Sequence, residues 1–370
     1  MKPPTIFLSA GDYSGDIASA RLVDSLRERN KDLLFTGLGG RLLKKIGQKQ
    51  IVSGEKLSVI GFWEVLKNIF FFKKLLNQAA NEIKSTSPNL VLLVDYPGFN
   101  LRLAEKVKSS GIPIIYYISP QVWAWGKGRI GKIRELIDKV LCILPFEQEF
   151  LSRNDIVNEF VGHYLMEDIP ESLISSPLPD DETLTLGLLP GSRAQEIERM
   201  LAIMLDASEL LAKKCKLKVL IAGISNRIDY QSFLNKRGKG LFEILFDDSR
   251  KVIGESNLIL CASGTATLET GIIGRPMVVI YKTGIITYQI AKRVLTIDKI
   301  ALVNLVLNEK VVPELIQNQA TAENISNELF KFIENQNYRD ETILKLHKIP
   351  SLLGGKGASQ RAANIICEYL

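Results

Sequence analysis

The chain has 370 residues, with 47 lysines and arginines against 41 aspartates and glutamates and a formal net charge of +6. This length suggests two domains, and a composition of 46% hydrophobic and 24% charged residues excludes a disordered or collagen-like chain. Four scattered cysteines without a CxxC pair and only two histidines argue against a disulfide framework, an Fe–S cluster and a multi-histidine metal centre. The scattered cysteines favour a reducing compartment. We predict no metal site and no cofactor.

The N-terminus and the apolar segments bear on localisation. Residues 1–10 run directly into a short apolar strand and lack the long apolar region and cleavage site of a signal peptide. No stretch reaches the roughly 18 apolar residues that a membrane-spanning helix needs, because charged residues interrupt both candidates. We expect a cytoplasmic protein.

The first half of the chain alternates apolar runs with amphipathic ones. Residues 6–10 predict a strand, and a glycine-containing turn then leads into a helix from about residue 16 to residue 29. Continuous apolar runs, as in strands covered by helices on both faces, lie at 89–94, 112–118 and 139–144. The pattern predicts a parallel α/β domain over residues 1–169.

The second half repeats this organisation after a proline-containing linker at residues 170–183. Strands are expected at 184–189, 217–222, 258–261 and 277–281, with a helix from about 195 to 214. We expect a second α/β domain over 184–350 and a helical tail over 351–370, whose packing on the first domain the sequence leaves open. Two such domains would enclose a cleft, and ligands bind outside the carboxyl ends of the strands.

Two polar motifs follow predicted strands of the first half. Asp95 comes directly after the strand at 89–94 and precedes a rigid turn, where a general base can be held; a turn or helix-capping aspartate is the alternative. The turn Ala10-Gly-Asp-Tyr-Ser-Gly-Asp16 suits an anion or a polar sugar group. It departs from GxGxxG, which disfavours a dinucleotide site, and the alternative for Asp16 is a cap of the helix that it opens.

The second half carries two turns of small residues at strand-to-helix junctions. Leu189-Pro-Gly-Ser-Arg193 begins one helix, and Ser263-Gly-Thr-Ala-Thr-Leu-Glu269 follows the strand that ends at Cys261. Small residues let backbone N–H groups approach a diphosphate, Arg193 can add a charge-assisted hydrogen bond, and Glu269 can accept hydrogen bonds from ribose hydroxyls. The alternative is a pair of purely structural turns.

Aromatic residues cluster in two segments. Ser119-Pro-Gln-Val-Trp-Ala-Trp125 places a glutamine and two tryptophans on a loop, which either forms an acceptor site or wedges the loop onto the sheet. Residues 60–76 combine Phe62, Trp63 and three consecutive phenylalanines with lysines, as in an interfacial membrane helix or an acyl-chain entrance. A core helix is the alternative. The basic residues are dispersed without a nucleic-acid motif, which favours anionic lipid or sugar phosphate as the partner.

Seven motifs in this order closely resemble those of the lipid-A-disaccharide synthase family, and the match spans almost the whole chain. They are Ala10-Gly-Asp-Tyr-Ser-Gly-Asp16, Val94-Asp-Tyr-Pro-Gly-Phe-Asn100, Ser119-Pro-Gln-Val-Trp-Ala-Trp125, Leu144-Pro-Phe-Glu147, Phe160-Val-Gly-His163, Leu188-Leu-Pro-Gly-Ser-Arg193 and Ala262-Ser-Gly-Thr-Ala-Thr-Leu-Glu269. Asp12 stands where the family's first motif usually has a longer glutamate.

The resemblance implies a GT-B-like fold with two Rossmann-like parallel-sheet domains facing across a cleft. It implies an inverting glycosyltransferase that condenses UDP-2,3-diacylglucosamine with 2,3-diacylglucosamine 1-phosphate (lipid X) to the β-1,6-linked lipid A disaccharide 1-phosphate and UDP, at the inner membrane surface. Asp95 corresponds to the proposed general base. The UDP side corresponds to Arg193, Ser263, Gly264, Thr265, Glu269 and Asn304. We assign the acceptor or sugar to Asp12, Ser14, Gln121 and Trp123, and the membrane or acyl chains to Phe62, Trp63, Phe70, Phe71 and Phe72.

Two alternatives belong to other classes. The first is another UDP-sugar enzyme on the same architecture, such as an epimerase or a transferase with a soluble acceptor, which would give the aromatic segment no purpose. The second is a non-catalytic peripheral lipid-binding protein. The presence of Asp95 and Arg193 argues against it. The sequence leaves the oligomeric state open, a homo-oligomer included.

Overall fold

The computed structural model describes residues 3–11, 13–52, 69–124, 126–180, 182–235, 237, 240–284 and 299–370. The chain divides into two compact units. The first unit comprises Met1–Tyr164 together with Gly354–Leu370, and the second comprises Leu165–Leu353. The division falls a few residues before the predicted 170–183 linker, and that segment lies within the second unit.

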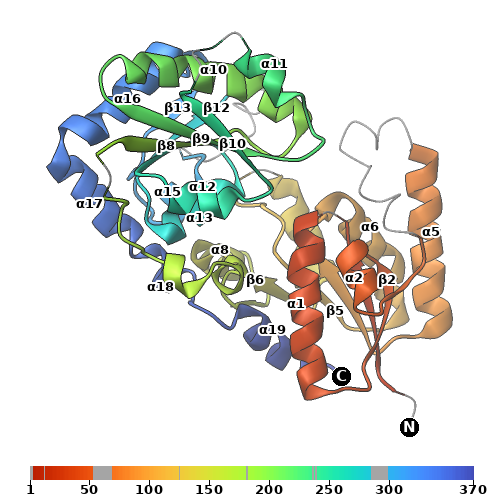
Figure 1. The fold of residues 1–370 in the computed structure, drawn as a ribbon. Coiled ribbons are helices and arrows are strands. Elements are labelled where there is room, and N and C mark those ends of the chain that lie inside the picture. Colours follow the sequence, from red (N-terminus) through yellow and green to blue (C-terminus); the bar gives the residue numbers. More distant parts are fainter. Residues whose placement is uncertain are drawn as a thin grey trace. The chain divides into compact units, whose positions relative to one another are not determined.

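The first unit is built on a fully parallel sheet, ordered β3-β2-β1-β4-β5-β6-β7 among the described residues (Figure 1). The strands are β1 (Thr5–Ala10), β2 (Leu34–Leu38), β3 (Lys49–Gln50), β4 (Leu90–Val94), β5 (Ile114–Tyr117), β6 (Lys139–Cys142) and β7 (Asn158–Phe160). The helices are α1 (Tyr13–Arg29), α2 (Arg41–Lys45), α5 (Ile69–Thr86), α6 (Pro97–Val107), α7 (Ile130–Leu136), α8 (Pro145–Ser152) and α19 (Ala358–Cys367).

The second unit has its own parallel sheet, ordered β10-β9-β8-β11-β12-β13. Its strands are β8 (Leu184–Leu189), β9 (Leu217–Gly223), β10 (Phe242–Phe246), β11 (Leu258–Ala262), β12 (Met277–Tyr281) and β13 (Glu314–Ile316). Its helices are α9 (Leu165–Asp168), α10 (Ala194–Ala212), α11 (Tyr230–Leu234), α12 (Ser249–Gly254), α13 (Thr265–Ile273), α15 (Leu302–Val306), α16 (Ala322–Glu334), α17 (Gln336–Leu346) and α18 (Ile349–Leu352).

The central strands explain why these sequences form sheets. All five residues of β4, Leu90–Val94, are buried, as are all four of β5. A strand covered by helices on both faces needs a continuous apolar run, and this is the pattern that predicted these strands. The predictions of the parallel α/β class and of its main strands are confirmed to within two residues at each end.

The C-terminal tail belongs to the first unit. Helix α19 packs against α1, and Arg29 on α1 donates hydrogen bonds to the Asn364 side chain at 2.6 Å and to the Gln360 carbonyl at 3.2 Å. Arg361 donates from Nε to the Val161 carbonyl at 2.7 Å. Residues 200 to 335 positions apart in the sequence therefore close the first unit.

Candidate functional site

The first candidate site lies at the carboxyl ends of β1 and β4. These strands are paired with each other in the sheet. On its other side β1 pairs with β2, while β4 pairs with β5. Ala10 and Val94 are paired in register, so the loops that follow them begin side by side. Such a switch point is where open α/β sheets bind ligands. The arrangement brings together Asp95 and the turn that starts at Gly11, with the half-buried Ser14 in the first turn of α1.

Asp95 itself has an unusual backbone. It and the following Tyr96 have φ values of 45° and 49°, in the left-handed region that residues with a side chain seldom adopt. The Asp95 N–H donates to the Tyr117 carbonyl at 3.1 Å, and its own carbonyl accepts from the Tyr116 hydroxyl at 2.5 Å. Strain of this kind persists only where surrounding contacts impose it, and it is common at functional sites. The Asp95 side chain is half-buried.

Asn100 is the main support of this turn, and the sequence analysis gave it no role. It is fully buried on α6, and its Nδ2 donates to the Asp95 carbonyl at 2.7 Å and to the carbonyls of Val94 and Ser9 at 3.2 and 3.3 Å. Its Oδ1 accepts from the Ser9 hydroxyl at 2.7 Å. One amide therefore joins the ends of β1 and β4. In the sequence, Asn100 stands between the apolar residues Phe99 and Leu101, and from this a buried asparagine with hydrogen-bond partners could have been predicted.

The glycine-rich turn after β1 is shaped by two close approaches. A Cβ on Gly11 would lie 2.2 Å from Cδ1 of Tyr96, so only glycine fits beside that ring. Asp16 is buried, and its carboxylate accepts from the backbone N–H groups of Gly40, Leu42 and Leu43 at 2.8, 2.9 and 3.2 Å. The alternative reading of Asp16 is thus corrected: it caps α2, not the helix on which it lies.

The loop after β5 is held by a buried carboxyl group. Trp123 is buried, its Nε1 donates to Oε1 of Glu147 at 3.0 Å, and its ring meets Phe146 edge to face at 4.8 Å. Oε2 of Glu147 accepts from the N–H groups of Ile143 and Leu144 at 3.2 and 3.1 Å. Trp123 therefore anchors the loop, whereas Gln121 on the same loop is exposed.

Glu147 is also electrostatically linked to Asp95. The pKa of the Glu147 carboxyl is raised to about 7, mainly by burial and in smaller part by the charge of Asp95, while the hydrogen bonds from Trp123 and the two backbone N–H groups oppose the rise. Sequence reasoning quoted Glu147 within a motif but gave it no role. Its position at the third residue of α8, where a glutamate can bond back to the helix start, was the available signal.

The second candidate site lies at the carboxyl ends of β8 and β11, the switch point of the other sheet. Leu189 and Cys261 are paired in register, so the loop that leads to Arg193 and the loop that begins at Ser263 start side by side. The Arg193 side chain is 82% exposed and lies 3.0 Å from Glu196. Gly264 and Thr265 are exposed at the start of α13, and a Cβ on Gly264 would meet nothing within 4 Å. This helix start is therefore open to a ligand.

Ser263 and Asn304 organise the neighbouring segment. The Ser263 hydroxyl donates to the Ile300 carbonyl at 3.1 Å. Asn304 is fully buried: Nδ2 donates to Glu314 at 2.8 Å and to the Val312 carbonyl at 2.9 Å, and Oδ1 accepts from the N–H groups of Val311 and Val312. Both ends of the Asn304 amide are thus engaged within the unit, although the sequence predicted it as a UDP contact.

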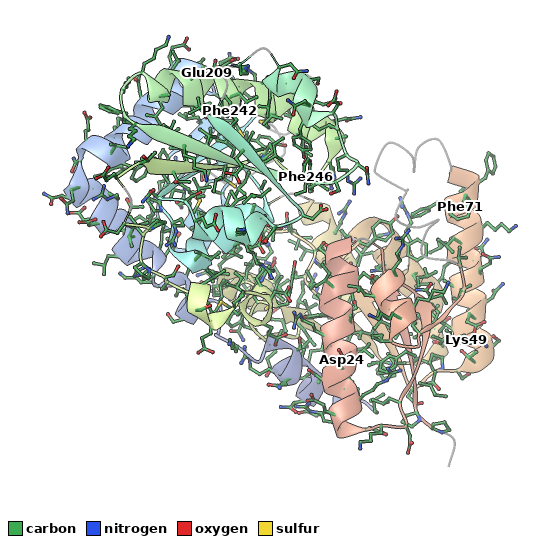
Figure 2. All side chains as sticks on the ribbon, in the orientation of Figure 1. Asp24, Lys49, Phe71, Glu209, Phe242 and Phe246 are labelled. Carbon is green, nitrogen blue, oxygen red and sulfur yellow. The ribbon has the colours of Figure 1, made fainter. Side chains whose placement is uncertain are left out.

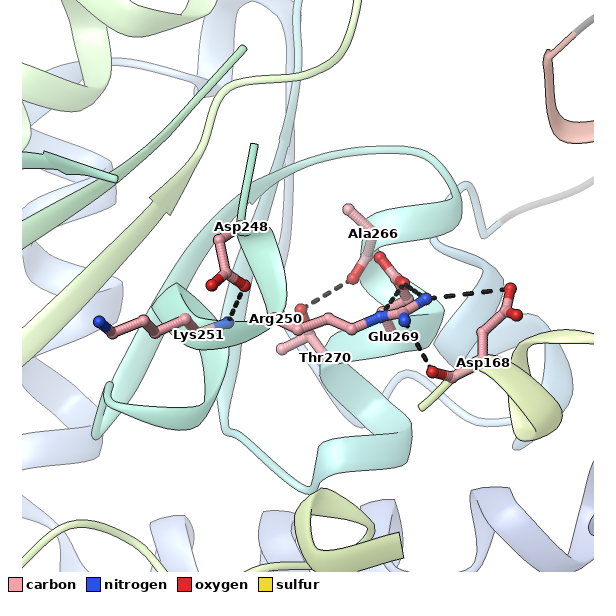
Figure 3. Close-up of polar contacts among 7 residues, drawn as sticks. All are labelled: Asp168, Asp248, Arg250, Lys251, Ala266, Glu269 and Thr270. Atoms are coloured by element: carbon pink, nitrogen blue, oxygen red, sulfur yellow. Dashed lines mark hydrogen bonds and ion pairs between the residues drawn. The ribbon is translucent and has the colours of Figure 1, made fainter. Parts of the chain in front are cut away.

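Glu269 lies within the first turns of α13 and pairs with Arg250 on α12. Figure 3 shows the guanidinium between Glu269 and Asp168. Burial raises the pKa of the Glu269 carboxyl, and the positive charge of Arg250 acts in the opposite direction. Sequence reasoning missed Arg250, because nothing in the chain around it marks a partner 19 residues away.

The three phenylalanines at the start of α5 have different environments. Phe70 is 86% exposed, and Phe71 is half-buried against the core (Figure 2). Phe72 is buried and contacts Phe99 edge to face, with 5.2 Å between the ring centroids. Lys73 and Lys74 are exposed beside them. Phe72 is therefore a core residue, which leaves Phe70 and Phe71 for the predicted membrane-facing surface. Asp12, Phe62 and Trp63 lie outside the described residues.

Two features are absent from the part of the chain that the structure describes. No helix there combines the length and hydrophobicity that crossing a membrane requires. No group of three or more histidine, cysteine, aspartate or glutamate side chains is arranged to hold a metal ion there.

Two Rossmann-like parallel sheets with polar loops at their switch points define the fold class of GT-B glycosyltransferases and nucleotide-sugar epimerases. The crystal structure of UDP-GlcNAc 2-epimerase from Neisseria meningitidis bound to UDP-GlcNAc is similar, with a TM-score of 0.66 at 15% identity, covering 100% of both chains. MurG from Acinetobacter baumannii has a TM-score of 0.64 at 14% identity, covering 99% of this chain and 100% of that one. Both show the fold alone.

Sequence comparison identifies the family. The model of the lipid-A-disaccharide synthetase family matches residues 6–366. The lipid-A-disaccharide synthase of Myxococcus xanthus is 36% identical, covering 100% of this chain and 98% of the relative, and that of Geobacter metallireducens is 33% identical, covering 99% and 97%. The chain belongs to the lipid-A-disaccharide synthase family of glycosyltransferases, which confirms the resemblance drawn from its motifs.

Proposed function

We propose that the protein transfers a 2,3-diacylglucosamine unit from UDP-2,3-diacylglucosamine to the 6-hydroxyl of 2,3-diacylglucosamine 1-phosphate, forming the β-1,6-linked lipid A disaccharide 1-phosphate and UDP. The observation that carries the proposal is the complementary chemistry of the two switch points. One presents a carboxylate on a constrained turn, and the other presents a cation and an open helix start. A transfer that releases a diphosphate needs both.

At the first site, Asp95 acts as the general base. It takes the proton of the acceptor 6-hydroxyl while that oxygen bonds to the anomeric carbon of the donor, and the bond from this carbon to the diphosphate breaks. Attack opposite the leaving group converts the α-linked donor into a β-linked product, which is inversion. The left-handed turn, fixed by Asn100 and Tyr116, supports this role because it fixes the backbone that carries the carboxylate.

At the second site, the departing UDP is stabilised without a metal or cofactor. The backbone N–H groups at the start of α13, next to Gly264 and Thr265, and the exposed Arg193 stabilise the negative charge of the diphosphate. Ser263 lines the same turn, and Glu269 accepts hydrogen bonds from the ribose hydroxyls. Asn304 acts indirectly, because its hydrogen bonds fix the segment that accepts the Ser263 hydroxyl bond.

The acceptor and the lipid chains are assigned to the first unit. Ser14 and Gln121 bind polar groups of the sugars together with Asp12, while Trp123 supports the loop of Gln121 through Glu147. Phe70 and Phe71, with Phe62 and Trp63, face the inner membrane from the cytoplasm and admit acyl chains. The exposed Phe70 beside Lys73 and Lys74 supports this, because apolar and cationic side chains together favour an anionic lipid surface.

Product analysis tests the proposal. The purified protein is incubated with UDP-2,3-diacylglucosamine and 2,3-diacylglucosamine 1-phosphate, and the anomeric configuration of the product is read by proton NMR. A β-1,6-linked disaccharide supports inversion by a single displacement. An α-linked product would contradict the role of Asp95 as general base, and 2-epimerised sugar would indicate an epimerase.

A further inference from the structure

Arg250 occupies the centre of a small ionic cluster in the second unit. Its Nε and Nη2 donate to Oε1 of Glu269 at 3.2 and 3.1 Å, and its Nη1 donates to the main-chain carbonyl of Asp168 at 2.7 Å (Figure 3). Nη2 also lies 3.9 Å from Oδ2 of Asp168. The side chains of Arg250, Glu269 and Asp168 are 34%, 15% and 8% exposed, so the contacts are shielded from water.

The two carboxylate oxygens of Glu269 differ in their hydrogen bonds. Oε1 takes both bonds from the guanidinium, whereas Oε2 has no hydrogen-bond partner among the described residues. Glu269 lies four residues after Thr265, where α13 begins. A carboxylate held by one oxygen in a fixed direction presents its other oxygen to a ligand at the same helix start.

Asp168, the third residue of the ionic cluster, is close in sequence to the boundary between the two units. Asp168 ends α9 (Leu165–Asp168), the first helix after the chain passes from the first unit to the second at residues 164 and 165. Arg250 reaches Asp168 across 82 residues of sequence. The same guanidinium therefore binds the Glu269 carboxylate and the end of the helix that follows the passage between the units.

We propose that Arg250 is a positioning residue of the nucleotide site. It holds one carboxylate oxygen of Glu269 so that the other oxygen accepts hydrogen bonds from the ribose hydroxyls. Through its contacts with Asp168 it also couples nucleotide binding to the conformation of α9. The inference rests on the proposed function, because it takes Glu269 as the ribose acceptor. Arg250 does not itself touch the nucleotide in this account.

The first test measures UDP affinity by titration calorimetry at pH 6 and pH 8.5 in the wild type, Arg250→Met and Arg250→Lys. Arg250→Met is expected to bind about tenfold more weakly at pH 6 and to recover part of this loss at pH 8.5. The recovery is expected because Glu269 without its cation takes up a proton at the lower pH, and a protonated carboxyl accepts hydrogen bonds poorly. Arg250→Lys, which keeps the charge, is expected to lie between the two.

The controls separate this role from a general loss of structure. Lys251→Met changes the next residue of α12, whose exposed ammonium lies 3.9 Å from Glu255, and it is expected to bind UDP like the wild type at both pH values. Glu269→Gln is expected to weaken binding without the pH-dependent recovery. Adding Arg250→Met to Glu269→Gln is expected to change the affinity by less than about twofold, since Arg250 acts through Glu269.

Hydrogen exchange tests the link to α9. UDP is expected to protect amides of residues 165–169 in the wild type and in Lys251→Met but not in Arg250→Met. Wild-type affinity of Arg250→Met at both pH values, or equal protection in all three proteins, overturns the inference while leaving the proposed function intact. A wild type that fails to bind UDP overturns both. Should Arg250→Met fail to fold, an affinity of Arg250→Lys equal to that of the wild type overturns the inference.

Discussion

The side chain of Asn100 donates a hydrogen bond of 2.7 Å to the main-chain carbonyl of Asp95, and the same amide holds the end of β1 through Ser9. Asn100→Ala is expected to lower the free energy of unfolding by about 3 kcal/mol, because it leaves several buried polar groups without a partner. It is also expected to reduce kcat more than it raises the KM for the donor, because the turn that carries Asp95 loses its support. Denaturant titration and steady-state kinetics measure the two effects.

Asn158→Ala is the matched control for that change, because Asn158 lies on the edge strand β7 and, among the described residues, its amide bonds with Ser152, Ile156 and the Cys142 thiol rather than with the Asp95 turn. It is expected to leave kcat unchanged. Equal kcat values for Asn100→Ala and the wild type would show that the support of the Asp95 turn has no catalytic consequence.

The close approach of Gly11 and Tyr96 gives a second prediction. Gly11→Ala places a methyl group where the Tyr96 ring lies, and the displacement is expected to cost about 2 kcal/mol of stability and to lower kcat by disturbing the neighbouring Asp95. Gly98→Ala, on α6 with nothing within 4 Å, is expected to be neutral or slightly stabilising. Thermal unfolding and turnover of both variants provide the comparison, and matching behaviour of the two would refute the steric argument.

How far the sequence predicts this site can be judged from these residues. Asp95, the turn that ends at Arg193 and the turn at Ser263 were singled out because they come after apolar strands, and parallel strands end at a common edge; their roles stay predictions. Asn100, Glu147 and Arg250 received no role, because their functions depend on contacts that local patterns do not encode. The alternative that Asp16 caps its own helix is wrong for the same reason: the N–H groups that it caps lie 24 to 27 residues away.

The fold shows the same division. Buried strands such as β4 and β8 were predicted almost to the residue. The two-residue β3 and three-residue β7 and β13 were not predicted, since so few residues carry no period from which a strand can be recognised. The five-residue β2 and β10 were not predicted either, because Thr36, Gly37 and Glu243 interrupt their apolar runs. Phe72 points into the core while Phe70 is exposed, because successive helix positions face different directions.

The buried His163 gives the stability of the protein a defined pH dependence. Burial lowers the pKa of its imidazole from 6.5 to about 3, so the folded state holds it neutral while the unfolded chain binds a proton. Its contribution is complete above pH 6.5 and is lost, at about 1 kcal/mol per pH unit, as the pH falls towards 3. Urea unfolding of the wild type and of His163→Phe between pH 7 and pH 5 measures this pH-dependent contribution of His163 to the free energy of unfolding. Parallel stability curves for the two proteins would contradict it.

Arg193 offers a test of the nucleotide site with little risk to folding. Its side chain is 82% exposed, and its ion pair with Glu196 adds little stability. Arg193→Ala is therefore expected to keep the thermal midpoint of the wild type while weakening UDP binding by about tenfold or more, through loss of a charge-assisted hydrogen bond. Arg199→Ala on the exposed side of α10 serves as the control. Unchanged UDP affinity in Arg193→Ala would exclude Arg193 from the diphosphate site.

The most direct test of the central claim is UDP release from UDP-2,3-diacylglucosamine, measured with and without 2,3-diacylglucosamine 1-phosphate, in the wild type and in Asp95→Asn. The account predicts release that requires the acceptor and that is lost in Asp95→Asn, while UDP binding persists because the residues of the proposed nucleotide site lie in the other unit. Acceptor-dependent release at the wild-type rate in Asp95→Asn, or no release by a folded wild type that binds UDP, would contradict it.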